Sequence, residues 1–241
     1  MGDLPAFLDA LHANRSTLLQ GLLTTLQATV YGAALALALA FTLGLAALDR
    51  RPLVRGTSRA IVEFFRGTSL YIQLFWLYYA MPQLLHYELQ PLFCGVVAFG
   101  LNYGAYGSEV VRGAIRAVPP GQREAAIALN LTPGQRLRHV ILPQAWVQMI
   151  PPFTNLLIQL VKCTPLLWLI SVTDLMTVIQ QLRDRTGETV PAYLTLLVLY
   201  FALASALTLL MNALERRAAT RLGRRPTRRT RPRKGALEVT P

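Results

Sequence analysis

Five long apolar stretches constrain this chain more than any other feature, and together they contain a single charged residue, Lys162. They are Leu18–Leu48, Ser69–Leu85, Pro91–Ser108, Ile141–Thr173 and Val190–Leu214. A helix of about 20 apolar residues spans the hydrocarbon core of a bilayer. With 53% hydrophobic and only 15% charged residues, the composition also excludes an ordinary soluble domain. We therefore predict an all-α, multi-pass membrane protein with five transmembrane helices. The second helix is expected to begin near Ser58 and to close at Met81-Pro82, and Pro151-Pro152 is expected to break the fourth.

The distribution of arginine predicts the orientation of these helices, because cytosolic segments carry an excess of basic residues. An external N-terminus and a cytosolic C-terminus leave only Arg15, Arg183 and Arg185 outside. We expect residues 1–17 to form a short external lead-in, 18–217 the membrane domain, and 218–241 a basic, disordered cytosolic tail. The arginines that this orientation places inside, besides the tail, are Arg50, Arg51, Arg55, Arg59, Arg66, Arg112, Arg116, Arg123, Arg136 and Arg138.

A polar segment at about 119–143 interrupts the apolar pattern and predicts two short helices. Pro119, Pro120 and Gly121 punctuate its start. Asn130 suits the left-handed position that ends a helix, and Thr132-Pro133 followed by Gln135 has the form of a capping box that starts the next one. Two short helices at an angle form a compact knob, and a knob on the cytosolic face of a membrane protein is a docking element.

This segment resembles the Glu-Ala-Ala (EAA) loop of ABC importer permeases, whose form continues with a glycine and then Ile-x-Leu-Pro. Asn130 stands in place of the glycine and Val140 in place of the isoleucine, and both keep the local conformation. In that family the loop inserts into a groove of the ATP-binding subunit and transmits its motion. The residues to which the resemblance assigns this coupling are Glu124, Ala125, Ala126, Asn130, Leu142 and Pro143.

Three further segments resemble signatures of the polar amino acid branch of that family, the histidine/glutamine/arginine type. Glu63–Leu70 resembles Glu-x-Phe-Arg-Gly-Thr-Pro-Leu, with serine in place of the proline. Tyr106–Gly113 resembles Tyr-x-x-Glu-x-x-Arg-Gly, and Lys162–Leu166 resembles Lys-x-Thr-Ser-Leu, with proline in place of the serine. The resemblance covers about residues 18–217.

The resemblance implies a type I ABC importer permease fold in the bacterial cytoplasmic (inner) membrane. The expected function is that of the transmembrane permease subunit of an ATP-driven importer for polar amino acids, working by alternating access. The implied partners are a second permease subunit, identical or homologous, two ATP-binding subunits and an extracytoplasmic solute-binding protein, besides membrane lipids. ATP would be bound by the partner, so no cofactor is expected in this chain.

The residues of the chain themselves argue against catalysis. Neither lysine, Lys162 or Lys234, follows a glycine, so the sequence lacks the Gly-x-x-x-x-Gly-Lys-Ser/Thr loop that cradles phosphates. The two cysteines, Cys94 and Cys163, lie in apolar segments and suggest neither a disulfide framework nor a metal site. The net charge of +12 comes largely from the C-terminal tail, which predicts contact with anionic lipid headgroups rather than with nucleic acid.

Polar residues inside the apolar stretches are candidates for a substrate path. Lys162 is expected to face the interior of the helix bundle, where it either contacts substrate or forms a structural ion pair, next to a helix break at Pro165. Glu109 either has a functional role or pairs with Arg112 or Arg66. Thr164 is a further candidate at this break. The other candidates, each with interhelical hydrogen bonding as the alternative, are Asn155, Gln159, Asn102, Tyr103 and Tyr106.

Other functions remain open at this point. Within the family, a compatible solute such as an ectoine-like zwitterion could replace the amino acid. From other classes, we keep an ATP-independent membrane channel and a membrane-anchored nucleic-acid-binding protein, although neither needs a docking loop. The sequence leaves open which solute is carried, whether the permease pair is identical or mixed, whether this subunit holds a substrate site, and what the tail does.

Overall fold

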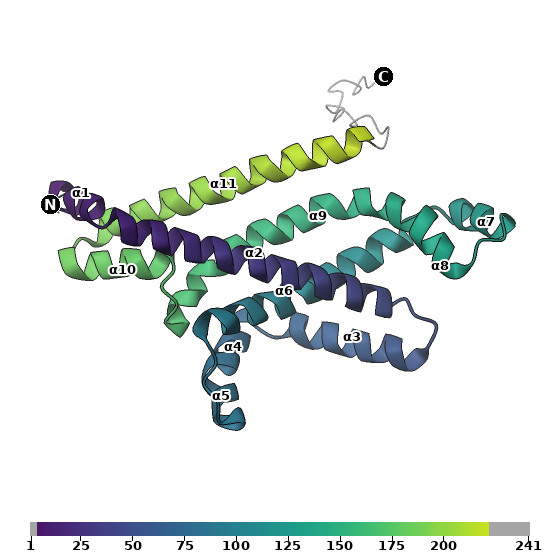
Figure 1. The fold of residues 1–241 in the computed structure, drawn as a ribbon, viewed down its shortest axis with the longest axis horizontal. Helices are drawn as coiled ribbons and strands as arrows, with labels where there is room; N and C mark the ends of the chain where they lie inside the picture. Colours follow the sequence, from purple (N-terminus) through teal and green to yellow (C-terminus); the bar gives the residue numbers. More distant parts are fainter. Residues whose placement is uncertain (1–3, 222–241) are drawn as a thin grey trace, which may run out of the picture.

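The computed structural model describes residues 4–221, which form helices joined by short loops, with no strand in that range (Figure 1). The all-α prediction is confirmed for this part of the chain. In chain order the elements are α1 (Leu4–Ala13), α2 (Arg15–Ala46), α3 (Pro52–Gly67), α4 (Leu70–Phe75), the π-helix η1 (Trp76–Ala80), α5 (Met81–Leu85), α6 (Pro91–Arg116), α7 (Pro120–Ala128), α8 (Pro133–Gln135), the π-helix η2 (Arg136–Ile141), α9 (Leu142–Cys163), the 3-10 helix η3 (Thr164–Ile170), α10 (Leu175–Thr186) and α11 (Thr189–Arg221).

The contact between α2 and α6 is the most extensive between any two described helices, and it forms the centre of the fold. Small residues permit it. A Cβ atom added at Gly44 of α2 would lie 2.8 Å from the Ser108 carbonyl oxygen of α6. One added at Gly104 of α6 would lie 2.8 Å from the Leu39 Cβ of α2. Such close approach of backbones is how helices pack in lipid, where apolar burial alone gives no preference for protein over acyl chains.

Three helical stretches in the described residues are long and apolar enough to cross a membrane: Arg15–Ala46, Pro133–Ile170 and Thr189–Ala213. They correspond to the first, fourth and fifth stretches predicted from the sequence. The third predicted stretch forms most of α6, which carries no charge before Glu109. The second differs from its prediction in detail.

A continuous second helix from near Ser58 is wrong, because α3 ends at Gly67 and α4 begins only at Leu70. Thr68 and Ser69 between them are extended, with ψ angles of 149° and 133°. Met81-Pro82 does not close the helical segment either, because Pro82 lies in the first turn of α5, where its missing N–H is tolerated, and the helix continues to Leu85.

The proline pair Pro151-Pro152 and the single Pro165, both in the fourth stretch, affect the helix differently. Pro151 and Pro152 lie inside α9 without ending it, so the break predicted there is wrong. Neighbouring helices and local adjustment often compensate for the donors that proline removes in membrane helices. The break predicted at Pro165 is confirmed, because the α-helix α9 ends at Cys163 and the chain continues as the 3-10 helix η3.

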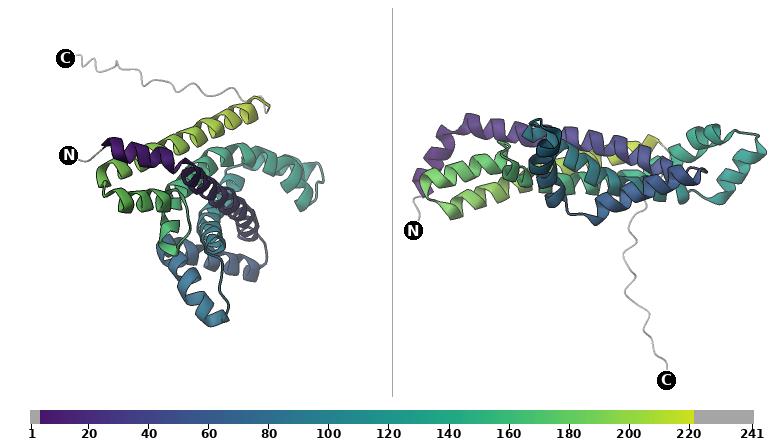
Figure 2. Two further views of the ribbon diagram at one scale, coloured as in Figure 1. Left: turned by 60° about the vertical axis from the view of Figure 1, so that its left-hand side comes forward. Right: turned by 90° about the horizontal axis from the view of Figure 1, so that it is seen from below.

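The molecule has two distinct ends. Figures 1 and 2 show α1, α10 and the start of α11 together at one end, and α7, α8 and the loop between α2 and α3 at the other. Phe7 of α1 is buried with Ile179, Leu182 and Ala192, so the predicted lead-in packs onto α10 and α11. Helix α11 continues through residue 217 to Arg221. The rest of the predicted tail, 222–241, lies outside the described residues.

Asp174 starts α10 and is fully buried, at 0% exposure. Its Oδ1 accepts hydrogen bonds from the Thr177 N–H at 2.9 Å and the Thr177 hydroxyl at 2.8 Å. Its Oδ2 is buried with no hydrogen-bond partner. Burial raises the pKa of the Asp174 carboxyl, because it disfavours the charged form more than the bonds from Thr177 favour it. At a pH between the unfolded and the folded pKa of this carboxyl, the folded chain therefore binds more protons than the unfolded chain.

Asp174→Asn is expected to stabilise the protein relative to the wild type as the pH rises above the unfolded carboxyl pKa of about 3.9. Asparagine keeps a capping side chain but cannot ionise. Asp174→Ala removes the cap as well as the carboxyl, and it should be about 1 kcal/mol less stable than the Asn variant at every pH. Thermal unfolding of the full chain in detergent, across a pH series, measures both effects. A constant difference in melting temperature between the Asn variant and the wild type would contradict the buried, proton-binding carboxyl.

Candidate functional site

The polar segment forms the knob expected from the sequence, which we define as residues 119–141 (α7, α8 and η2). Helix α7 closes with Asn130 in the left-handed region, at φ 54°. The N–H of Leu131 donates to the Ala126 carbonyl at 3.1 Å, and the N–H of Asn130 donates to the Ile127 carbonyl at 2.9 Å, which together make a Schellman motif. The next helix starts with the reciprocal capping box between Thr132 and Gln135. The local predictions for this segment are confirmed.

The side chains of α7 divide into a buried and an exposed set. Ala126 is buried, at 2% exposure, so it packs inside this chain instead of lying on its surface. Glu124 and Ala125 are exposed. Ile127 and Leu129 are exposed at 55% and 74%, although both are large and apolar. Sequence reasoning missed these two, and their signal was apolar side chains in an otherwise polar segment. The exposed surface of the knob therefore combines a carboxylate with apolar side chains.

Two contacts connect the knob to the long helices. The Arg123 guanidinium donates through Nη2 to the Ile115 carbonyl near the end of α6, at 2.6 Å. Gln144 of α9 donates through Nε2 to the Gln122 side chain of α7, at 3.1 Å. The π-helix η2 also runs directly into α9, where Leu142 is partly buried in the core and Pro143 is exposed in the first turn. The knob is therefore joined to both α6 and α9.

A polar face on α9 carries the second group of candidate residues. Asn155, Gln159 and Lys162 follow one another at helical spacing, and all three are exposed on this chain. None of the three side chains has a hydrogen bond or ion pair with any described residue. The predicted pairing of Lys162 with Glu109 is therefore absent from this part of the chain. The face lies in one of the stretches apolar enough to span a membrane.

The helix break beside Lys162 is held by buried hydroxyl groups. Thr164 is fully buried, its hydroxyl donates to the Val161 carbonyl at 2.8 Å, and it lies 3.2 Å from the Tyr200 hydroxyl of α11. The Tyr103 hydroxyl of α6 donates to the Cys163 Sγ at 3.2 Å. Thr164 and Tyr103 thus fix the position of the break, whereas Lys162 points away from these contacts.

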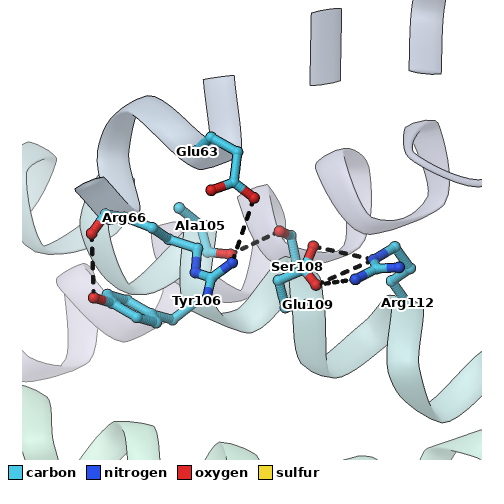
Figure 3. A network of polar contacts seen from close by, with 7 residues as sticks. All are labelled: Glu63, Arg66, Ala105, Tyr106, Ser108, Glu109 and Arg112. Atoms are coloured by element: carbon cyan, nitrogen blue, oxygen red, sulfur yellow. Dashed lines mark hydrogen bonds and ion pairs between the residues drawn. The ribbon is translucent and has the colours of Figure 1, made fainter. Parts of the chain in front are cut away.

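Glu109 and Tyr106 lie where α3 meets α6, and Figure 3 shows their contacts. Glu109 forms an ion pair with Arg112 one turn on, with both carboxylate oxygens accepting from the Arg112 Nε at 3.0 and 3.1 Å. The Tyr106 hydroxyl donates to the Arg66 carbonyl at 3.4 Å, and the Arg66 guanidinium lies 5.4 Å from the centre of the Tyr106 ring. Arg66 also pairs with Glu63 at 3.7 Å. Glu109 was expected either to have a functional role or to pair with Arg112 or Arg66, and in this structure it pairs with Arg112.

Asn102 is buried, and its amide joins two helices. It donates to the Phe65 carbonyl at 3.1 Å and to the Gln73 side-chain oxygen at 3.4 Å. Gln73 in turn donates to the Phe65 carbonyl at 2.9 Å and to the Thr68 hydroxyl at 2.6 Å. These bonds satisfy the backbone where α3 stops. Asn102 is therefore an interhelical hydrogen-bonding residue here, and Gln73 is a partner that the sequence reasoning did not single out.

The predicted candidates thus form separate groups. Among residues 4–221 no hydrogen bond or ion pair joins the polar face of α9 to the contacts of Asn102, Tyr106 and Glu109. The same residues contain no cluster of three or more His, Cys, Asp or Glu side chains that could hold a metal ion.

Comparison with known proteins gives consistent matches. Residues 36–220 match the family described as "Binding-protein-dependent transport system inner membrane component". Over 201 residues the chain is 42% identical to the "Probable amino-acid ABC transporter permease protein y4tF" of Sinorhizobium fredii, covering 81% of this chain and 84% of that protein. It is 33% identical over 201 residues to the "Arginine transport system permease protein ArtQ" of Bacillus subtilis, covering 83% and 91%. A solved structure, "Crystal structure of an amino acid ABC transporter with histidines", superposes with a TM-score of 0.81 at 26% identity, covering 88% of this chain and 98% of that one.

Substitutions at Asn130 test the conformation that separates α7 from α8. Asn130→Gly should leave the knob intact, because glycine adopts a positive φ without strain. Asn130→Val should destabilise the knob locally by about 1–2 kcal/mol, because a branched Cβ is disfavoured in the left-handed region. Hydrogen exchange over residues 120–140 of the full chain measures the difference. Equal protection in the two variants would contradict the Schellman motif.

Proposed function

We propose that this chain, which belongs to the binding-protein-dependent transport system inner membrane component family, carries polar amino acids as the permease subunit of an ATP-driven importer. It is an inner-membrane ABC transporter permease, as the sequence resemblance predicted. Coupling to an ATPase follows from the family. The polar amino acid substrate is supported by the names of relatives, which include an arginine permease and an L-cystine permease.

The proposed topology has five transmembrane segments, with the N-terminus outside and the C-terminus in the cytosol. The five are α2, the segment from α3 to α5, α6, α9 with η3, and α11. The orientation is supported by the two ends of the molecule. Arg50, Arg51 and Arg116 line a cleft together with residues of the knob, and α10 lies at the opposite end of the molecule (Figure 1). The solute-binding protein would then meet the α10 end.

The ATP-binding subunits are proposed to dock on the knob. Its exposed residues Glu124, Ala125, Ile127 and Leu129 would form the contact, and the buried Ala126 would keep α7 in shape. Asn130, Leu142 and Pro143 would set the angle between the knob and α9. ATP would be bound and hydrolysed by the partner, so this chain would need no cofactor. Closure of the ATPase pair would shift the knob and, through Arg123 and Gln144, the inner ends of α6 and α9.

The observation that carries the substrate proposal is the polar face of α9. A lysine and two amides exposed within a membrane-spanning stretch are costly when they face lipid. We place this face, Asn155, Gln159 and Lys162, toward a second permease subunit, identical or homologous, across the central pathway. Lys162 would bind the α-carboxylate of the amino acid, and the helix break beside it would help to shape the site. A compatible zwitterion carries the same carboxylate and remains the alternative substrate.

A substitution on the knob tests the docking proposal. Leu129→Asp should lower copurification of the ATP-binding subunits by about tenfold or more, because it places a charge in an apolar contact. Leu53→Asp is the matched control, since Leu53 is 83% exposed at the start of α3, outside the knob. Copurification from membranes, with the amount of inserted permease measured in parallel, gives the answer. Equal recovery of the ATPase with both variants would contradict docking of the ATPase on the knob.

Substitutions at Lys162 test whether this residue contacts the substrate. Lys162→Met should leave assembly and ATP hydrolysis intact but lower amino acid uptake by about tenfold to a hundredfold, the range expected for losing one charge-assisted hydrogen bond. Lys162→Arg keeps the charge and should retain part of the uptake. Uptake by the assembled importer in proteoliposomes, with its solute-binding protein, measures the effect. Unchanged uptake and selectivity in the Met variant, or loss of the folded complex, would contradict substrate contact.

A further inference from the structure

A cleft at the knob end of the molecule is lined by apolar residues and by a smaller group of arginines. Its volume is about 820 Å³. Leu45 and Leu48 at the end of α2, Ile115 of α6, and Leu137 and Ile141 of η2 form its apolar wall. Its charged residues are Asp49, Arg50, Arg51, Arg116 and Arg123. We propose that this cleft binds an anionic phospholipid of the inner leaflet, with the phosphate of the headgroup held by the arginines.

The position of the cleft along the helices fits the boundary between hydrocarbon and water. Helix α2 carries no charge from Ser16 to Leu48, and Asp49, Arg50 and Arg51 follow at once. Arg116 is the last residue of α6. The α2 part of the apolar wall therefore lies where an uncharged segment ends, and Arg50 and Arg51 lie just beyond it. On α6 the first charge, Glu109, precedes Ile115 and Arg116, so these two residues lie on the polar side of that boundary. A phospholipid at this depth would present acyl carbons to the wall and its phosphate to the arginines. This placement rests on the proposed orientation.

The arginines of the cleft are available for a ligand. Arg50, Arg51 and Arg116 are exposed, and their side chains have no hydrogen bond or ion pair with any described residue. Arg123 uses Nη2 to donate to the Ile115 carbonyl, while its Nε is buried without a partner. The one acid in the lining, Asp49, accepts from the Arg51 backbone N–H at 2.8 Å. Four cations face one carboxylate, so the cleft attracts an anion with several acceptor oxygens.

The apolar wall distinguishes a lipid from the other anions that four arginines could attract. Free phosphate would leave the leucine and isoleucine side chains uncovered. An acidic segment of the ATP-binding subunit is a different partner, but the exposed apolar residues of the knob, Ile127 and Leu129, do not line the cleft. Only a ligand with an anionic head and an apolar body uses both parts of the lining.

The test compares the retention of phosphatidylglycerol by matched variants of the full chain. Arg50→Gln combined with Arg116→Gln removes two charges from the cleft. Arg55→Gln combined with Arg59→Gln removes two charges from exposed positions of α3 that do not line it. The proteins are purified in detergent with an equal mixture of phosphatidylglycerol and phosphatidylcholine, and bound lipid is counted by native mass spectrometry. A parallel sample contains inorganic phosphate as a competitor, and Arg50→Lys with Arg116→Lys keeps the charge.

The cleft variant, Arg50→Gln with Arg116→Gln, should retain about tenfold less phosphatidylglycerol or lower still, since each basic residue near an anionic headgroup contributes about fivefold. The α3 variant, Arg55→Gln with Arg59→Gln, and the double lysine variant should retain the lipid. Three outcomes would overturn the proposal: equal loss in the α3 variant, unchanged retention in the cleft variant, or displacement of the lipid by inorganic phosphate. Lipid retention does not depend on which solute is carried, so it fails or succeeds independently of the proposed transport function.

Discussion

The close packing of α2 against α6 is the contact on which the other parts of this structure depend. Gly44 and Gly104 allow it, because any larger residue would meet the opposite helix at less than normal contact distance. Hydrogen bonds also join other elements to this pair. The Ser58 hydroxyl of α3 donates to the Leu43 carbonyl at 2.7 Å, and the Leu175 N–H of α10 donates to the Thr25 hydroxyl at 3.2 Å. In lipid, such packing and interhelical hydrogen bonds replace the apolar burial that holds soluble domains together.

What could be predicted from the sequence depended on the range of the interactions involved. The turn at Asn130 and the capping box at Thr132 arise from neighbours within a few residues, so their pattern is visible in the sequence. The end of α3 at Gly67 is not visible in the sequence, because it is stabilised by Gln73 and by Asn102 of another helix. The long apolar helices were predictable from composition and length alone, since the bilayer imposes both.

The candidate site follows the same division. Lys162 was identifiable as the one charge in its stretch, and the structure leaves it exposed. Asn102 and Glu109 drew attention for the same reason, yet each is occupied within the chain, one by the Phe65 carbonyl and the other by Arg112. The sequence shows that a polar group is present in the membrane domain but not whether a partner from a distant segment reaches it. The burial of Ala126 was equally inaccessible, because it depends on which face of α7 turns inward.

Polar groups that find partners within the chain hold the fold, whereas unpartnered ones are available to another molecule. The polar face of α9 and the arginine cleft are two such surfaces in the described part of this permease, and one helical segment connects them. Ile141 lines the cleft at the end of η2, and α9 runs from Leu142 to the break beside Lys162. At about 1.5 Å per residue, its 22 residues extend for about 33 Å, close to the thickness of the hydrocarbon core. One helix therefore joins the cleft, where we propose that a lipid binds, to the lysine that we propose contacts the solute.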